Sequence, residues 1–117
     1  MSEFGAYIRQ RREARIENGK PLSLRKLSQR IGIEPAYLSK IERGDFAPPS
    51  EEVIRKLAFE LDEDADMLLA MAGKVSKDLL DIIVRRPMLL AELLRKIKEM
   101  PDHAVLRIVR EVKDGEW

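Results

Sequence analysis

Apolar residues recur along this chain at the spacing of α-helices, most clearly between residues 23 and 44. Leu24, Leu27 and Ile31 stand three and four positions apart, which places them on one helical face. Leu38 and Ile41 repeat the pattern after a short break. The pattern predicts two short helices that bury these side chains and turn their opposite faces outward.

End signals separate the two helices. Ser23 is a good N-cap, and Leu22 and Leu27 occupy the positions of a hydrophobic staple. Gly32 supplies the left-handed residue that ends the first helix, and Pro35 suits the first position of the second. Two helices joined by such a turn form a helix-turn-helix, which is a DNA-reading element.

Three more helices are predicted around this pair. The first covers residues 3–18, with Phe4 and Ile8 facing inward. Ser50 caps the fourth, which follows two prolines, and acidic residues open a fifth that ends at Gly73. The expected buried side chains of the last two helices are Val53, Ile54, Leu57, Ala58, Leu61, Met67, Leu68 and Met71.

Beyond Gly73 the composition changes, and three short helices are predicted. Ser76 and Asp102 can cap the first and last of them, and Pro87 can begin the middle one. Residues 75–112 hold eighteen large aliphatic or methionine side chains in 38 positions, more than three short helices can hide among themselves. A second copy of the chain is the simplest cover. Packing on the N-terminal domain and binding another protein are the alternatives. The expected dimerisation residues are Leu79, Ile83, Leu90, Leu93, Leu94, Ile97, Val105, Ile108, Val109 and Val112.

Three segments together resemble the lambda-repressor/Cro-like (XRE-type) helix-turn-helix family of transcriptional regulators. They are LSLRKLSQRIGI, AYLSKIERG and PPSEEVIRKLAFEL, and the resemblance covers about residues 4–72. It implies an all-α protein with a five-helix DNA-binding domain in residues 1–73. A C-terminal helical dimerisation segment of about three helices would follow in residues 74–117.

The resemblance also assigns roles to residues of the third helix, which would enter the major groove of double-stranded DNA. Base contacts would fall on Pro35, Ala36, Ser39 and Lys40. Lysine can donate to guanine N7 and O6, so Lys40 is the expected main reader. Family members pair an arginine of the first helix with a glutamate of the IERG-like segment, and here Arg12 and Glu42 match these positions.

Other residues are expected at the phosphate backbone. The N–H groups at the Ser23 end of the second helix can bind phosphate, and Arg25 and Lys26 follow in its first turn. Tyr37 and Arg43 would contact phosphate or sugar. Ordinary solvated charge is the competing explanation for the two cations of the first turn. Family members often place basic residues after the third helix, but here Phe46 follows and is expected to pack.

Net charge is +1 overall and unevenly distributed. Residues 1–49 carry +4, residues 50–75 carry −4 and residues 76–117 carry +1. The basic excess therefore coincides with the helix-turn-helix, as attraction to phosphate requires, although scattered solvated charge would give a similar figure.

Composition excludes several classes of function. The chain has no cysteine and one histidine, His103, and no phosphate-binding glycine loop, so an enzyme and a bound cofactor are not expected. The acids at residues 62–66 lack the glycine and glutamate of a calcium loop, so no metal site is expected. No secretory or membrane-spanning segment is recognisable, and we expect a cytoplasmic protein.

Two functional hypotheses remain. The first is a homodimeric repressor that reads an inverted repeat through helix 35–43, because a two-fold dimer presents two recognition helices to two half-sites. The second is an antitoxin or other interaction protein, whose C-terminal helices bind a toxin or regulatory protease and whose DNA binding serves autoregulation.

Overall fold

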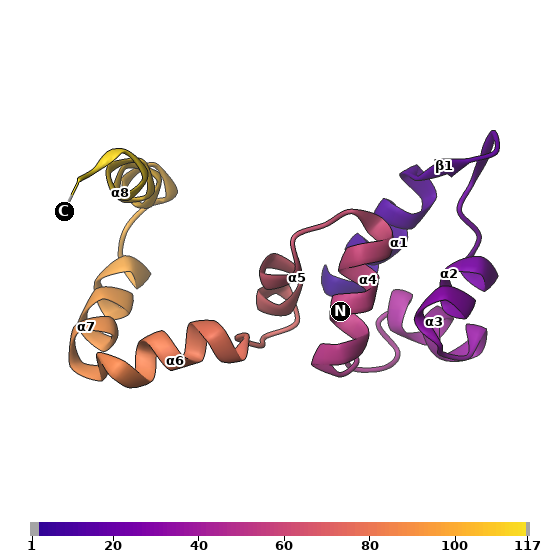
Figure 1. The fold of residues 1–117 in the computed structure, drawn as a ribbon, viewed down its shortest axis with the longest axis horizontal. Helices are drawn as coiled ribbons and strands as arrows, with labels where there is room; N and C mark the ends of the chain where they lie inside the picture. The colour runs from indigo at the N-terminus through magenta and orange to yellow at the C-terminus, as the bar shows by residue number, and fades with distance from the viewer. Residues whose placement is uncertain (1–2, 117) are drawn as a thin grey trace. The chain divides into compact units, whose positions relative to one another are not determined.

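The computed structural model describes residues 3–116 and confirms the all-α fold. Its helices and one small hairpin are drawn in Figure 1. The helices are α1 (Glu3–Ala14), α2 (Leu24–Ile31), α3 (Pro35–Glu42), α4 (Glu51–Leu61), α5 (Ala65–Met71), α6 (Lys77–Arg85), α7 (Pro87–Lys98) and α8 (Asp102–Asp114), and the strands are β1 (Ile16–Glu17) and β2 (Lys20–Pro21). The chain divides into two compact units between Ser76 and Lys77.

The caps in the first unit explain where its helices begin. Ser23 Oγ accepts a hydrogen bond from the backbone N–H of Lys26 at 3.1 Å, and Ser50 Oγ accepts one from Val53 at 3.4 Å. Asp64 does the same for Met67 at 3.0 Å, so the acidic stretch starts α5 through one specific carboxylate. Gly32 ends α2 with φ 76°, the left-handed conformation expected of it.

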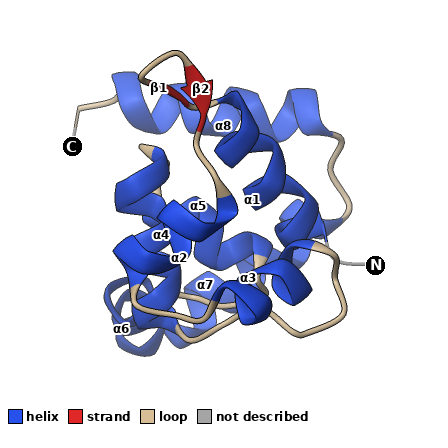
Figure 2. Cartoon of the chain, turned by 90° about the vertical axis from the view of Figure 1, so that its right-hand side faces the viewer, coloured by secondary structure: helices blue, strands red, loops and turns tan. Residues whose placement is uncertain are grey.

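The predicted helix over residues 3–18 was too long. α1 stops at Ala14, and the chain forms an antiparallel hairpin in which Ile16 pairs with Pro21 and Glu17 with Lys20. Figure 2 shows this hairpin in red against the blue helices. Asn18 and Gly19 form its turn with φ of 52° and 78°, which suits Asn-Gly and matches the twist of paired strands. The hairpin therefore replaces the last turn of the helix predicted over residues 3–18.

All five helices of the first unit contribute to one core. α1, α2 and α3 bury Phe4, Ile8, Leu27, Ile31, Leu38 and Ile41, and α4 covers them with Ile54, Leu57, Ala58 and Leu61. The prediction for α5 was partly wrong, because Leu69 is buried beside Leu68 whereas Met67 is exposed and Met71 only partly covered. α5 is seven residues long, so two adjacent leucines suffice to hold it on the core.

The second unit contains α6, α7 and α8, and none of these helices buries a side chain. Pro87 begins α7 as expected. Asp102 does not cap α8, because the helix already includes it and Pro101 occupies the cap position without a side-chain hydrogen bond. Ser76 and Lys74 belong to the first unit, where Ser76 is buried and Lys74 Nζ donates to the carbonyl of Pro49 at 2.8 Å.

Gly5 marks the closest approach of α1 to α3. A Cβ at this buried position would collide with the carbonyl oxygen of Ile41 and crowd that of Glu42. The obstruction is backbone at the end of α3, which cannot rotate away as a side chain can. Glycine here lets the two helices pack at a distance that no other residue permits.

We therefore expect Gly5→Ala to destabilise the protein by about 1–3 kcal/mol through overpacking. Helix propensity alone favours alanine over glycine by about 1 kcal/mol in a helix interior. A stabilised Gly5→Ala variant would therefore show that the close contact between α1 and α3 does not require glycine. Chemical unfolding measures the difference. Gln10→Ala, at an exposed position of the same helix, is the control and should change stability by no more than about 0.5 kcal/mol.

Candidate nucleic-acid interface

The helix-turn-helix is built by α2 and α3, which pack together through their buried faces. Ile33 donates its N–H to the carbonyl of Ser28 at 3.0 Å, so the turn folds back on α2 before α3 begins. Leu27, Leu38 and Ile41 then point into the core. The remaining faces of both helices are turned to solvent.

The four residues expected to contact bases differ in exposure. Ala36 and Lys40 are exposed and stand one turn apart on α3, whereas Pro35 and Ser39 are half-buried. A methyl group and an ammonium on one face of a helix can contact a thymine methyl and the acceptors of guanine. Glu34 precedes them at the N-cap without a side-chain hydrogen bond, so the first N–H groups of α3 have no side-chain partner there.

Tyr37, expected to contact phosphate or sugar, is less exposed than a free surface residue. It is half-buried and packs against the core, and its ring centroid is 6.0 Å from that of Phe46 at an angle of 50°. Lys40 Nζ lies 4.9 Å from the centroid of the same Phe46 ring. Phe46 does pack, but on two residues of α3 rather than in the core. Periodicity could not find this contact because Phe46 belongs to a loop.

The expected phosphate-binding residues of α2 gather at its N-terminus. Ser23, Arg25 and Lys26 are all exposed. Ser23 and Lys26 line a hollow of about 380 Å³ together with Lys20 of the hairpin, a cation that the sequence did not single out. The Asn-Gly turn could have indicated Lys20, because this turn brings residue 20 back toward α2.

Arg43, the last of the expected phosphate contacts, is exposed at the end of α3. Its Nε lies 3.5 Å from Asp45 Oδ2, and both side chains are more than half exposed. Such a pair contributes little to stability and exchanges readily with solvent. Arg43 can therefore leave Asp45 for a phosphate at small cost.

The structure brings Arg12 and Glu42 together as a bidentate pair. Arg12 Nε donates to Glu42 Oε2 at 2.8 Å and Nη2 to Oε1 at 2.9 Å, while Nη1 donates to the carbonyl of Leu22 at 3.0 Å. The side chains are only 11% and 3% exposed. The hydrogen bonds to Glu42 raise the pKa of Arg12.

A second cluster ties the hairpin to the end of α2. Arg30 reaches both carboxylate oxygens of Glu17, at 2.8 and 2.6 Å, and Arg15 Nε contacts Oε2 at 3.1 Å. These hydrogen bonds, from Arg30 first and Arg15 second, lower the pKa of Glu17 to about 2. The hairpin is thereby fixed beside the helix that would cross the DNA backbone.

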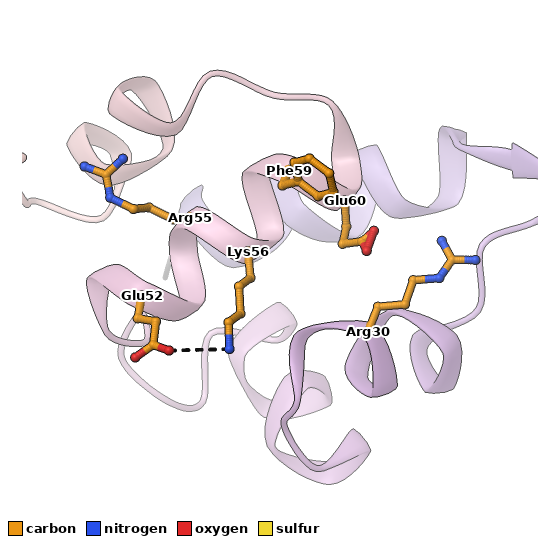
Figure 3. Close-up of a pocket in the computed structure, with 6 residues that line it drawn as sticks. All are labelled: Arg30, Glu52, Arg55, Lys56, Phe59 and Glu60. Atoms are coloured by element: carbon orange, nitrogen blue, oxygen red, sulfur yellow. Dashed lines mark ion pairs between the residues drawn. The ribbon is translucent and has the colours of Figure 1, made fainter.

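An open groove of about 450 Å³ lies between α2 and α4 (Figure 3). Arg30 belongs to α2 and pairs with Glu17 of the hairpin, whereas Lys56 of α4 pairs with Glu52 at 3.5 Å across one helical turn. Arg55 pairs with Glu51 at 3.0 Å, and Phe59 is 84% exposed. The cations of this groove already have carboxylate partners, which distinguishes it from the open face of α3.

Residues 3–116 contain neither a metal-binding cluster nor a membrane-spanning helix. No three histidine, aspartate or glutamate side chains there are arranged to hold a metal ion. None of the helices in that range combines the length and apolar character needed to cross a bilayer.

Comparison with known proteins points to the same element. Residues 3–68 match the helix-turn-helix domain family. The uncharacterized HTH-type transcriptional regulator RghRB of Bacillus subtilis is 37% identical over 75 residues, which are 64% of this chain and 50% of that protein. Proteins with the same description from two strains of Mycobacterium tuberculosis are 36% identical over 69 residues, 59% of this chain and 45% of theirs. The chain thus spans about half the length of these curated relatives, and no solved structure matches it.

The buried ion pair leads to a prediction for stability. Glu42→Gln keeps the shape of the side chain but leaves the Arg12 guanidinium buried without its counter-charge, which should cost about 3 kcal/mol in urea unfolding. Glu13→Gln is the matched control, because Glu13 pairs with Arg9 at 3.5 Å with both side chains more than half exposed. The control should change stability by less than about 1 kcal/mol. Equal effects of the two substitutions would contradict a structural role for the buried pair.

Proposed function

The chain belongs to the helix-turn-helix domain family, and from that premise we propose that it is a sequence-specific DNA-binding transcriptional regulator of the lambda-repressor/Cro-like type. It acts as a homodimeric repressor, with α3 in the major groove of an inverted-repeat operator. The relatives named as HTH-type transcriptional regulators support the general class, and the family match over residues 3–68 contains α2 and α3.

The outward face of α3 is the observation that carries this proposal. Ala36 and Lys40 are exposed side by side, while Leu38 and Ile41 on the opposite face are fully buried. A helix in the major groove needs small and hydrogen-bonding side chains on the face it presents to base edges. The cations around the N-terminus of α2 lie on the neighbouring element, which crosses the backbone in this docking geometry.

Exposed apolar side chains on the second unit support dimerisation. Of the expected dimerisation residues, Leu79, Leu93, Leu94, Val109 and Val112 are more than 40% exposed, and the others are half-buried. Apolar surface of this extent commonly marks an interface. A two-fold dimer through α6, α7 and α8 would present two α3 helices to half-sites about 34–36 Å apart.

The same surface favours one alternative, in which α6, α7 and α8 bind another protein such as a toxin or a regulatory protease. DNA binding would then serve autoregulation. The oligomeric state of the purified protein separates the two functions. If α6, α7 and α8 bind another protein, the purified chain should not form a two-fold dimer through them. Sedimentation of the wild-type chain is therefore the first measurement.

For base reading, Lys40→Ala should relax the preference at one base pair and weaken binding there by about 1–3 kcal/mol. Fluorescence anisotropy with a duplex selected from random DNA, and with each of its single-base variants, measures this change. Lys56→Ala, which removes a cation already paired with Glu52, is the control. Equal losses on selected and scrambled DNA would instead show that Lys40 contacts phosphate.

For assembly, Leu93→Glu combined with Leu94→Glu should convert the dimer to a monomer, because two charges would be buried at the interface. DNA binding by the monomer should be weak and strongly dependent on salt. Phe59→Glu is the control at an exposed apolar residue of the first unit and should leave the dimer intact. A dimer that survives the double substitution would place the interface elsewhere.

A further inference from the structure

A cluster of two rings and one ammonium stands at the end of α3, formed by Tyr37, Lys40 and Phe46. We propose that Phe46 is a positioning residue that orients the Lys40 ammonium for contact with a guanine, and thereby determines specificity although it lies outside the recognition helix. This proposal rests on the proposed function, because it assigns a role within the same DNA-reading site.

The loop after α3 is fixed to Lys40 by its backbone. The N–H groups of Asp45 and Phe46 both donate to the carbonyl of Lys40, at 2.9 and 3.3 Å. These two hydrogen bonds therefore hold the backbone of Phe46 at a fixed position relative to Lys40. The centroid of its ring lies 4.9 Å from Lys40 Nζ, well inside the range of a cation–π contact.

Tyr37 contacts the same Phe46 ring. Its own ring packs against the core, and its tilted contact with Phe46 at 6.0 Å is typical of favourable aromatic pairs. Tyr37 precedes Lys40 by three residues, so the two side chains emerge from the same face of α3. The contacts thus run from the core through Tyr37 and Phe46 to the ammonium.

An oriented lysine is useful at a base-reading position. A free lysine side chain has four rotatable bonds, and ordering it on binding opposes affinity. The Phe46 ring limits that freedom before DNA arrives, while its 46% exposure leaves the cluster open on the solvent side.

The orientation itself can be tested in the free protein. In the wild type, NMR signals of the Lys40 ε-methylene should be shifted upfield by the Phe46 ring. Phe46→Leu should remove the shift, and Phe46→Tyr should retain it. An unshifted wild-type signal would overturn the proposal before any DNA is added.

Binding then tests specificity. Phe46→Leu should weaken binding to the selected duplex about two- to fivefold, the range expected of an exposed cation–π contact, and leave scrambled DNA unaffected. Phe46→Tyr should restore the affinity. Phe59→Leu is the matched control, since it removes an exposed ring that lines the groove between α2 and α4.

A double substitution decides whether Phe46 acts through Lys40. In a Lys40→Ala background, Phe46→Leu should have no further effect on the selected duplex. An equal loss in both backgrounds, or a gain in affinity with Phe46→Leu alone, would overturn the proposal, because the ring would then act independently or hold the ammonium away from DNA. If Lys40→Ala relaxes the preference at its base pair and Phe46→Leu leaves binding to the selected duplex unchanged, this inference fails while the proposed function stands. A wild-type protein without base preference would contradict both.

Discussion

The buried pair between Arg12 and Glu42 is the interaction on which the geometry of the DNA-binding unit depends. One guanidinium joins three segments, because it contacts Glu42 at the end of α3 and the carbonyl of Leu22 before α2 while it belongs to α1. Because the pair is buried, displacing either segment would leave an unpaired charge in the interior, which would lower the stability of the fold. Gly5 adds a steric limit on the same contact by letting the α1 backbone meet the last carbonyls of α3. Together they determine which face of α3 can point outward.

The two units use their apolar residues in opposite ways. In the first, every helix buries part of its stripe in one core. In the second, leucines and valines with the same spacing remain exposed or half-buried. One acid of the first unit has two internal partners, since Glu63 accepts a hydrogen bond from Tyr7 at 2.6 Å and pairs with Arg11 at 2.7 Å. That hydrogen bond raises the pKa of Tyr7. In the proposed function, the outward face of α3 and the exposed apolar side chains of α6 to α8 are the surfaces that bind partners.

Much of this fold could be read from the sequence, because local signals agreed with packing. The caps at Ser23 and Ser50, the left-handed Gly32 and the proline at the start of α7 all act where they were expected. The hairpin was missed because residues 9–15, RQRREAR, are mostly good helix formers, although Asn18 and Gly19 carry a turn signal that outweighs them. Arg12 and Glu42, thirty positions apart, could be paired only through family resemblance. The contact of Phe46 with Lys40 was not predictable, because it depends on the path of a loop that has no period.

In the proposed function, the outward face of α3 distinguishes base sequences. The most direct measurement is the ¹⁵N chemical-shift perturbation of the protein by its selected duplex, compared with a scrambled duplex of equal length. Both should perturb residues around Ser23 to Lys26 and Arg43, whereas only the selected duplex should strongly perturb Ala36, Ser39 and Lys40. Differences confined to other elements, with α3 unchanged between the two duplexes, would contradict the account.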